Sequence, residues 1–103
     1  MSLPPEWSDP AWCEREYNPR LSVADAPALL AHWSALAQAA RARLPHEADI
    51  VYGDHPREWI DLFPAADAHG LLIFIHGGYW MALSKHEHSW VAECLVAAGI
   101  SVA

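Results

Sequence analysis

The most constraining feature of this sequence is an uninterrupted apolar run at residues 71–75, Leu-Leu-Ile-Phe-Ile. A run of this length without polar alternation is typical of a β-strand that is buried on both faces of a sheet. Helical periodicity follows from about Lys85, Gly99 marks the C-terminal stop of that helix, and residues 100–103 begin another strand. A strand, a helix and a second strand predict a parallel βαβ crossover, and therefore an α/β fold.

Two segments precede the predicted sheet. Residues 1–24 contain four prolines and two tryptophans. Because proline removes a backbone donor and restricts the residue before it, we predict an irregular arm that lies against the rest of the protein. Residues 25–44 carry apolar side chains at spacings of three and four, with Pro27 in the first turn and Pro45 as the stop, which predicts an amphipathic helix.

Residues 45–103 are predicted to form the first strands and the first βαβ crossover of a domain. Residues 48–52 and 58–63 have the character of strands, and the short link between them predicts antiparallel pairing. The chain stops four residues into the last predicted strand, which would leave strands of the buried type with open edges. We therefore expect the N-terminal portion of a larger α/β fold, incomplete at its C-terminus, rather than a self-sufficient domain.

Composition excludes several classes of protein and partner. Hydrophobic residues make up 53% of the 103 residues and charged residues 18%, which is too apolar for a disordered chain. The net charge of −7 argues against nucleic acid and anionic membranes as partners, because both select clustered lysine and arginine. The sequence has neither a secretory signal nor an apolar run long enough to span a bilayer, so we expect a cytoplasmic protein.

The sequence His76-Gly77-Gly78-Tyr79-Trp80 directly follows the apolar run and precedes the predicted helix. Two glycines allow the backbone to turn sharply, with φ values that a Cβ would penalise. Such a turn can aim successive N–H groups at one point, where they stabilise negative charge that develops on a carbonyl oxygen in acyl transfer. The alternative is a turn in which the glycines serve geometry alone.

Residues 71–80 resemble the oxyanion-hole segment of the α/β-hydrolases, which carry an HGGG-type motif in the loop after the third strand. The Tyr-Trp pair in place of the third glycine resembles the branch of kynurenine formamidases (arylformamidases) and related esterases. Further likeness to that branch extends the resemblance over nearly the whole chain; it lies at residues 17–20, 52–53, 61–64 and 97–103. The resemblance implies hydrolysis of an aryl formamide or a small carboxylic ester without a cofactor, and it does not separate these two substrates.

The resemblance also implies roles for the residues of the motif. Gly78 and Tyr79 would donate the backbone N–H groups of the oxyanion hole, and Gly77 would set the geometry of the turn. His76 would be a structural residue whose ring hydrogen-bonds the loop backbone, while Tyr79 and Trp80 would shape the substrate pocket. The oligomeric state stays open, with a homo-oligomer among the alternatives.

None of the serines stands in the G-x-S-x-G pattern that presents the nucleophile of these hydrolases. We therefore expect the nucleophile, acid and base in the remainder of the fold, downstream of Ala103 or on a second chain, and the chain alone should be inactive. The alternative function is a non-catalytic hydrolase-like fragment or pseudo-enzyme that binds a partner chain through its open sheet edge.

Other polar groups favour structural roles. His76, His86 and His88 suggest a metal-dependent hydrolase, but an i, i+2 pair points to different sides of a helix. We therefore expect no metal, and solvated histidines at positions 86 and 88. Asp61 and Asp67 have no third carboxylate at a useful spacing, so neither is predicted to belong to a site.

The predicted last helix contains two further features. Ser84 and Glu87 fit a capping box, in which each side chain bonds the backbone N–H of the other residue. Cys94 stands beside Leu95 on the apolar face, so it is predicted to be a buried structural thiol. Cys13, in the N-terminal arm, is predicted to be inert.

Overall fold

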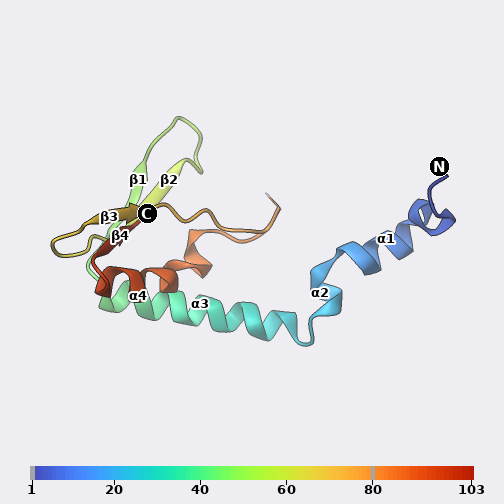
Figure 1. The fold of residues 1–103 in the computed structure, drawn as a ribbon, viewed down its shortest axis with the longest axis horizontal. Helices are drawn as coiled ribbons and strands as arrows, with labels where there is room; N and C mark the ends of the chain where they lie inside the picture. The colour runs from blue at the N-terminus through green and yellow to red at the C-terminus, as the bar shows by residue number, and fades with distance from the viewer. Residues whose placement is uncertain (1, 80) are drawn as a thin grey trace. The chain divides into compact units, whose positions relative to one another are not determined.

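The computed structural model describes residues 2–79 and 81–103 (Figure 1). The chain divides into two compact units, Met1–Leu30 and Ala31–Ala103. Trp80, which the resemblance assigns to a substrate pocket, lies outside the described residues. In the part of the chain that the structure describes, no helix is long and apolar enough to cross a membrane.

The first unit contains three short helical segments: η1 (Pro5–Ser8), α1 (Pro10–Tyr17) and α2 (Pro19–Ser22). This differs from the irregular arm that the prolines predicted. Each segment begins with its proline, at a position where the missing N–H costs no hydrogen bond. Asp9 and Asn18 cap α1 and α2, because each side chain accepts a hydrogen bond from the backbone N–H two residues later. The prolines limit the length of the helices without preventing them.

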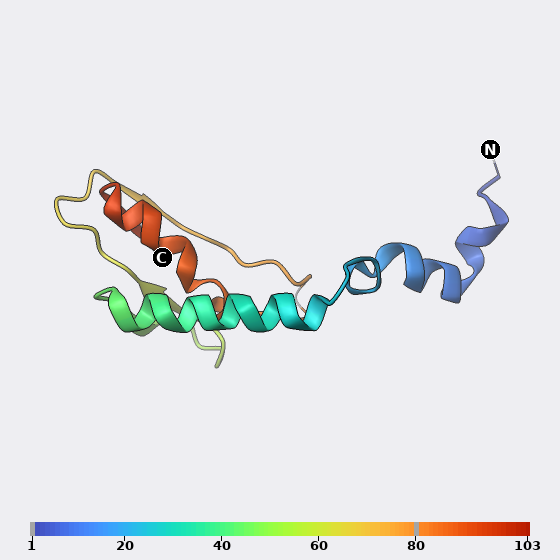
Figure 2. The same cartoon turned by 90° about the horizontal axis from the view of Figure 1, so that it is seen from below.

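The long helix α3 (Ala26–Arg43) matches the predicted amphipathic helix to within one residue at each end. Within the second unit it runs beside η3 (Ser89–Val91) and α4 (Ala92–Ala97), as two views of the ribbon show (Figures 1 and 2). The rings of Trp33 and Trp90 meet between them, with centroids 6.4 Å apart. The apolar face of α3 therefore packs on the segment that leads into the last strand.

Strands β1 (Glu47–Val51) and β2 (Trp59–Leu62) form the predicted antiparallel pair. The register places Ile50 opposite Ile60 and contains a bulge between Glu47 and Ile50. Within this bulge Asp49 has a left-handed φ of 58°. A bulge re-aims the residues that it contains, and here it turns the backbone N–H of Asp49 toward a side chain of β2.

The predicted parallel pair is present as β3 (Gly70–Leu72) and β4 (Ile100–Val102), which α4 connects. An isolated antiparallel bridge joins Phe63, just after β2, to Val102 of β4, through reciprocal backbone hydrogen bonds of 2.8 and 2.9 Å. This bridge links the two pairs in the order β1-β2-β4-β3. The second unit therefore has a mixed α/β fold (Figure 1).

The apolar run at residues 71–75 is less buried than predicted. β3 ends at Leu72, and the side chains of Ile73 and Ile75 are 69% and 85% exposed. β3 pairs with β4 alone, and within the described residues it reaches the hydrophobic cluster through Leu72. A strand is buried on both faces only where a layer covers each face. The prediction that residues 71–75 form such a strand is therefore wrong for these 103 residues.

The predicted last helix is divided into shorter pieces. η2 (Lys85–Glu87) and η3 are 3₁₀-helices, and α4 follows them. The capping box is confirmed, because the Ser84 hydroxyl caps η2 while the Glu87 carboxylate accepts the Ser84 N–H at 2.7 Å. Cys94 is exposed, and its predicted burial is wrong. Ala92 is the buried residue of α4. Cys94 comes two residues later, so its side chain points to the opposite, exposed side of the helix.

Candidate functional site

The glycine loop, residues 76–83, leads from the segment after β3 to η2. The entry to the loop still pairs with its neighbour, because the Phe74 N–H donates to the Ala103 carbonyl at 2.8 Å. Gly78 has a φ of +109°, and its carbonyl accepts hydrogen bonds from Met81 and Ala82 at 3.0 and 3.1 Å. A Cβ at Gly78 would lie 1.8 Å from the Ala82 carbonyl oxygen. Only glycine fits this position.

Tyr79 continues the turn with a left-handed φ of 52°, and its side chain is exposed. This conformation costs an L-residue roughly 1–2 kcal/mol, and such strain concentrates at functional sites. A Cβ at Gly77 would meet nothing within 4 Å. The positive φ values of this turn are therefore at Gly78 and Tyr79, and the role of Gly77 in the turn stays a prediction.

Two histidine rings stack at the beginning of this loop. Nδ1 of His76 lies 2.7 Å from the Gly77 carbonyl oxygen, so the ring bonds the loop backbone as expected. The ring of His88 stacks on it with centroids 6.0 Å apart, and its Nδ1 lies 2.8 Å from the Ser84 carbonyl oxygen. His88 is buried, and the prediction of a solvated residue is wrong because the Trp33 and Phe74 rings also pack on it. The stack joins the two ends of the glycine loop.

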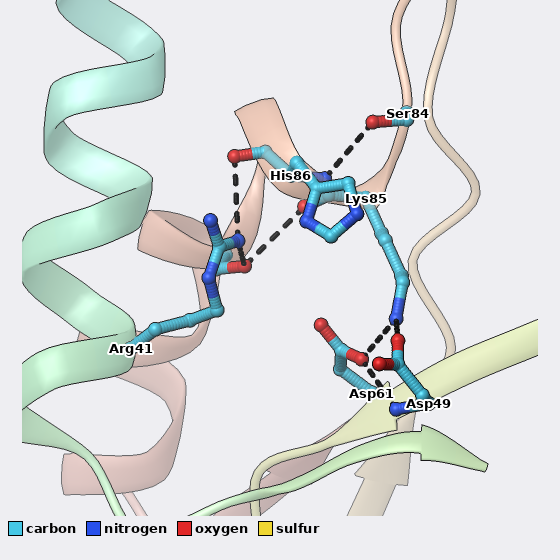
Figure 3. A network of polar contacts seen from close by, with 7 residues as sticks. Arg41, Asp49, Asp61, Ser84, Lys85 and His86 are labelled. Carbon is cyan, nitrogen blue, oxygen red and sulfur yellow. Dashed lines mark hydrogen bonds and ion pairs between the residues drawn. The ribbon is translucent and has the colours of Figure 1, made fainter.

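A charged network follows the loop directly (Figure 3). The ammonium group of Lys85 donates hydrogen bonds to the carboxylates of Asp61 on β2 and Asp49 in the bulge of β1. Asp61 is only 6% exposed, and it also accepts the Asp49 N–H at 3.0 Å. The Lys85 nitrogen lies 5.3 Å from the centre of the Trp59 ring, a cation–π distance.

Sequence analysis missed this network because Lys85 is 24 residues from Asp61 along the chain. One signal was present: Asp61 alternates with Phe63 on the same side of β2, and Phe63 is in the core. A carboxylate on a buried face needs a cation or several donors. The partner of Asp61 is therefore a cation, Lys85, and not a further carboxylate.

The network perturbs the acid–base behaviour of its members. Burial alone would raise the pKa of Asp61, but the hydrogen bonds from Lys85 and Asp49 and the charge of Lys85 outweigh burial and hold that pKa below its usual value. Burial alone would lower the pKa of Lys85, but the two carboxylates raise it above its usual value. Both residues are therefore charged at neutral pH.

Acidification below about pH 4 is expected to destabilise the fold through Asp61. Because its pKa is lower in the folded state, the carboxylate contributes stability above its unfolded pKa, and this contribution disappears as the pH falls through the folded value. Urea unfolding between about pH 6 and pH 2 should show a smaller acid loss in Asp61→Asn than in the wild type. Asp67→Asn, outside the network, is the control and should retain the wild-type acid loss. An equal loss in Asp61→Asn and the wild type would contradict this prediction.

A second cation fixes the same segment from α3. Nη1 of Arg41 donates to the Ser89 hydroxyl at 2.7 Å and to the His86 carbonyl at 3.3 Å (Figure 3). The Ser89 hydroxyl in turn donates to the Lys85 carbonyl at 3.3 Å. Hydrogen bonds that involve a charged donor are stronger than neutral ones. The segment after the glycine loop is therefore held by α3, β1 and β2 together.

A cavity of about 740 Å³ opens between β2, the extended residues 73–76 and the segment from η2 to η3. Its wall includes four aromatic side chains, Tyr52, Trp59, Phe63 and Phe74, and also the charged Asp61 and Lys85 of the network. His76, the first residue of the glycine loop, also lines it. A cavity of this size and aromatic character suits a small molecule with an apolar or aryl part.

The serines at this cavity are occupied by structural hydrogen bonds. Ser84 donates its hydroxyl to Glu87 and Ser89 donates to the Lys85 carbonyl, so within the described ranges neither hydroxyl donates to a histidine. Burial alone would raise the pKa of Glu87, but its bonds with Ser84 lower it. Among residues 2–79 and 81–103, no group of three or more His, Cys, Asp or Glu is placed to hold a metal ion.

Two curated relatives of this chain are named kynurenine formamidase. The chain is 36% identical over 92 residues to a kynurenine formamidase from Danio rerio, an alignment that covers 84% of this chain and 31% of that protein. It is 31% identical over 100 residues to a kynurenine formamidase from Salmo salar, covering 86% of this chain and 33% of that protein. The chain thus spans about a third of the length of these curated relatives. No family model matches it.

A solved structure has a similar fold over most of this chain. The crystal structure of a protein from Silicibacter sp. TM1040, described as a candidate thioesterase, superimposes with a TM-score of 0.75 and 31% sequence identity. The match covers 84% of this chain and 35% of that one. The elements of this chain therefore correspond to about a third of an enzyme-like α/β structure.

Proposed function

We propose that this chain forms the N-terminal part of a serine hydrolase of the α/β-hydrolase type, in which the glycine loop supplies the oxyanion hole. The turn at Gly78 and Tyr79 carries this proposal. It is a glycine-only position followed by a second left-handed residue, placed after a strand of a parallel pair. The similarity to proteins named kynurenine formamidase supports the assignment of the turn to acyl transfer.

In such a reaction a serine oxygen attacks the carbonyl carbon of the substrate, and the carbonyl oxygen gains negative charge. The backbone N–H groups of Gly78 and Tyr79 would donate to this oxygen. Each donor of this kind contributes about 3–4 kcal/mol of transition-state stabilisation. The base takes the serine proton and passes it to the amine or alcohol that the intermediate expels; the same base then takes a proton from the water that attacks the acyl-serine and returns it to the serine as the acid is released. The loop acts only in the steps that create or remove charge on that oxygen.

An aryl formamide or a small carboxylic ester is the proposed substrate. The aromatic wall of the 740 Å³ cavity, beside the first residue of the loop, supports a substrate with an apolar or aryl part. A pocket of this type discriminates one methylene by only about 1–3 kcal/mol. A complete hydrolase with this pocket is therefore expected to be active on a formamide, an ester or both.

The nucleophile, acid and base are proposed to come from the remainder of the hydrolase fold, in the same polypeptide or in a second one. That remainder would also cover the exposed apolar residues Leu71, Ile73 and Ile75. The same exposed surface supports the alternative function, a non-catalytic fragment that binds a partner chain through its sheet. In both cases another part of the protein or another chain covers this apolar surface. A hydrolase additionally needs a reactive serine in that covering part.

The test starts with the intact mass of the native protein, compared with the 11.4 kDa of these 103 residues. The native preparation is then assayed for hydrolysis of N-formylkynurenine and p-nitrophenyl esters, and for covalent labelling by a fluorophosphonate. We expect hydrolysis and labelling together with additional polypeptide, and no activity from the 103-residue chain alone. A native protein of 11.4 kDa without hydrolysis, labelling or a co-purifying chain overturns the hydrolase proposal and leaves the partner-binding alternative.

A further inference from the structure

The glycine loop is anchored at its two ends by different forces. At its beginning, the bond from Phe74 to Ala103 and the stacked rings of His76 and His88 hold the backbone. Inside the loop, the Gly78 carbonyl accepts two bonds from residues of the same loop, which shape the turn but do not attach it to the sheet. The far end is therefore placed by whatever fixes Ser84 and the residue after it.

Lys85 provides the part of this attachment that reaches the β1–β2 hairpin, beside the bond of His88 to the Ser84 carbonyl and the bonds of Arg41 to His86 and Ser89. It is the first residue of η2, and its ammonium group reaches Asp61 on β2 and Asp49 in the β1 bulge (Figure 3). Its side chain is mostly buried, and Asp61 is nearly completely buried. The connection runs over 24 residues to β2 and 36 residues to β1, so it joins the loop to a hairpin that is distant in sequence.

A buried ion pair is a poor device for stability alone. Desolvation offsets much of the attraction, and apolar side chains of similar volume often stabilise a protein as well or better. An ion pair with two acceptors does specify position, because the ammonium group must lie where both carboxylates accept its protons. The bulge at Asp49 strengthens this argument, since it adds a backbone donor that orients Asp61 toward the lysine.

We infer that Lys85, held by Asp61 and Asp49, is a positioning residue that sets the place of the glycine loop relative to the sheet. This inference deepens the proposed function and rests on it for its catalytic consequence. The Lys85 side chain lines the 740 Å³ cavity, but in this role its ammonium group would be held by the two carboxylates. It would act through the backbone of Ser84 and the loop before it, so that the Gly78 and Tyr79 N–H groups point to one place.

Hydrogen exchange of the Met81 and Ala82 amides tests the positioning without any assay of activity. Both amides donate to the Gly78 carbonyl and report the opening of the loop. In Lys85→Met they should exchange at least about tenfold faster than in the wild type, because the end of the loop loses its bonds to Asp61 and Asp49. The amides of Phe63 and Val102, which pair across the core, should accelerate by a smaller factor, because they report the stability of the whole unit and not the loss of the loop anchor.

Arg43→Met is the matched control. It also replaces a cation by methionine, but the ion pair that it removes, that of Arg43 with Glu93, is single, exposed and outside the loop and its anchors. Lys85→Arg keeps the positive charge and should recover most of the protection of Met81 and Ala82. If Lys85→Met does not fold, Asp49→Asn removes one of the two negative charges that hold Lys85, at an exposed residue, and a smaller rise in exchange at the same two amides is expected. Unchanged exchange in the folded variant overturns the inference, as does an equal rise at Phe63 and Val102.

Kinetics separate this inference from the proposed function. In the complete hydrolase, Lys85→Met should lower kcat at least about tenfold, a larger factor than its effect on KM, because oxyanion donors act in the transition state rather than in substrate binding. A wild-type protein without hydrolase activity refutes the proposed function, while the exchange experiment still decides whether Lys85 positions the loop. An active wild type whose kcat is unaffected by Lys85→Met refutes the catalytic consequence of the inference.

Discussion

Replacing Gly78 with alanine is expected to lower kcat/KM of the complete hydrolase at least about 100-fold, the effect of losing one oxyanion donor. The new Cβ would lie 1.8 Å from the Ala82 carbonyl oxygen, so either the turn or the Ala82 peptide must move. The φ of +109° is also unfavourable for any residue with a Cβ. Both consequences displace the N–H groups of Gly78 and Tyr79. Steady-state rates with N-formylkynurenine and a p-nitrophenyl ester measure the loss.

Gly70→Ala is the control, because it makes the same chemical change at another glycine near this loop. Gly70 begins β3, and a Cβ there would meet nothing within 4 Å. Its effect on kcat/KM should be within about twofold, as for surface substitutions that remove no contact. Circular dichroism and thermal melting confirm that both variants are folded before their rates are compared. A folded Gly78→Ala enzyme with wild-type rates would contradict an oxyanion role for this turn.

The main elements of the second unit follow from local patterns in the sequence. Apolar spacing of three and four residues predicts α3, and the Ser84–Glu87 spacing predicts a capping box that the structure contains. Alternation and a short link predict the β1–β2 pair, and two apolar segments around a helix predict the parallel pair of β3 with β4. Each element depends on neighbours within a few residues, so periodicity and turn chemistry reveal it, and the pairing of β3 with β4 follows from the rule that a helix between two strands makes a parallel crossover.

The parts that sequence reasoning missed depend on distant contacts or on backbone angles. The pairing of Lys85 with Asp61 joins residues 24 positions apart, and no local pattern connects them. The burial of His88 follows from rings on α3 and on the segment after β3. The choice between Gly77 and Gly78 as the strained position is set by φ, which two adjacent glycines do not reveal. The sequence therefore predicts which segment forms the glycine loop, but it does not predict the ion pairs, ring contacts and backbone angles that hold this loop in place.

Replacing Phe63 with alanine is expected to destabilise the second unit by about 3–5 kcal/mol, the usual cost of removing a buried phenylalanine ring. Phe63 is 3% exposed and forms the core cluster with Ala92 and Val102, and its ring stacks on His46 with centroids 4.9 Å apart. The void that the substitution leaves would lie where the end of β2 meets β4, at the isolated bridge that joins the two strand pairs in the described residues. Urea unfolding followed by tryptophan fluorescence measures the change.

Tyr52→Ala is the control for Phe63→Ala, since it removes another aromatic ring from the same hairpin. The Tyr52 side chain is 64% exposed, so its loss should change the free energy of unfolding by less than about 0.5 kcal/mol. The backbone bond from the Tyr52 N–H to the Glu58 carbonyl, 2.9 Å long, does not depend on the ring. Equal effects of the two substitutions would mean that the two strand pairs do not share a core at Phe63. A large effect of Phe63→Ala alone would show that this ring joins the hairpin to the strands that carry the glycine loop.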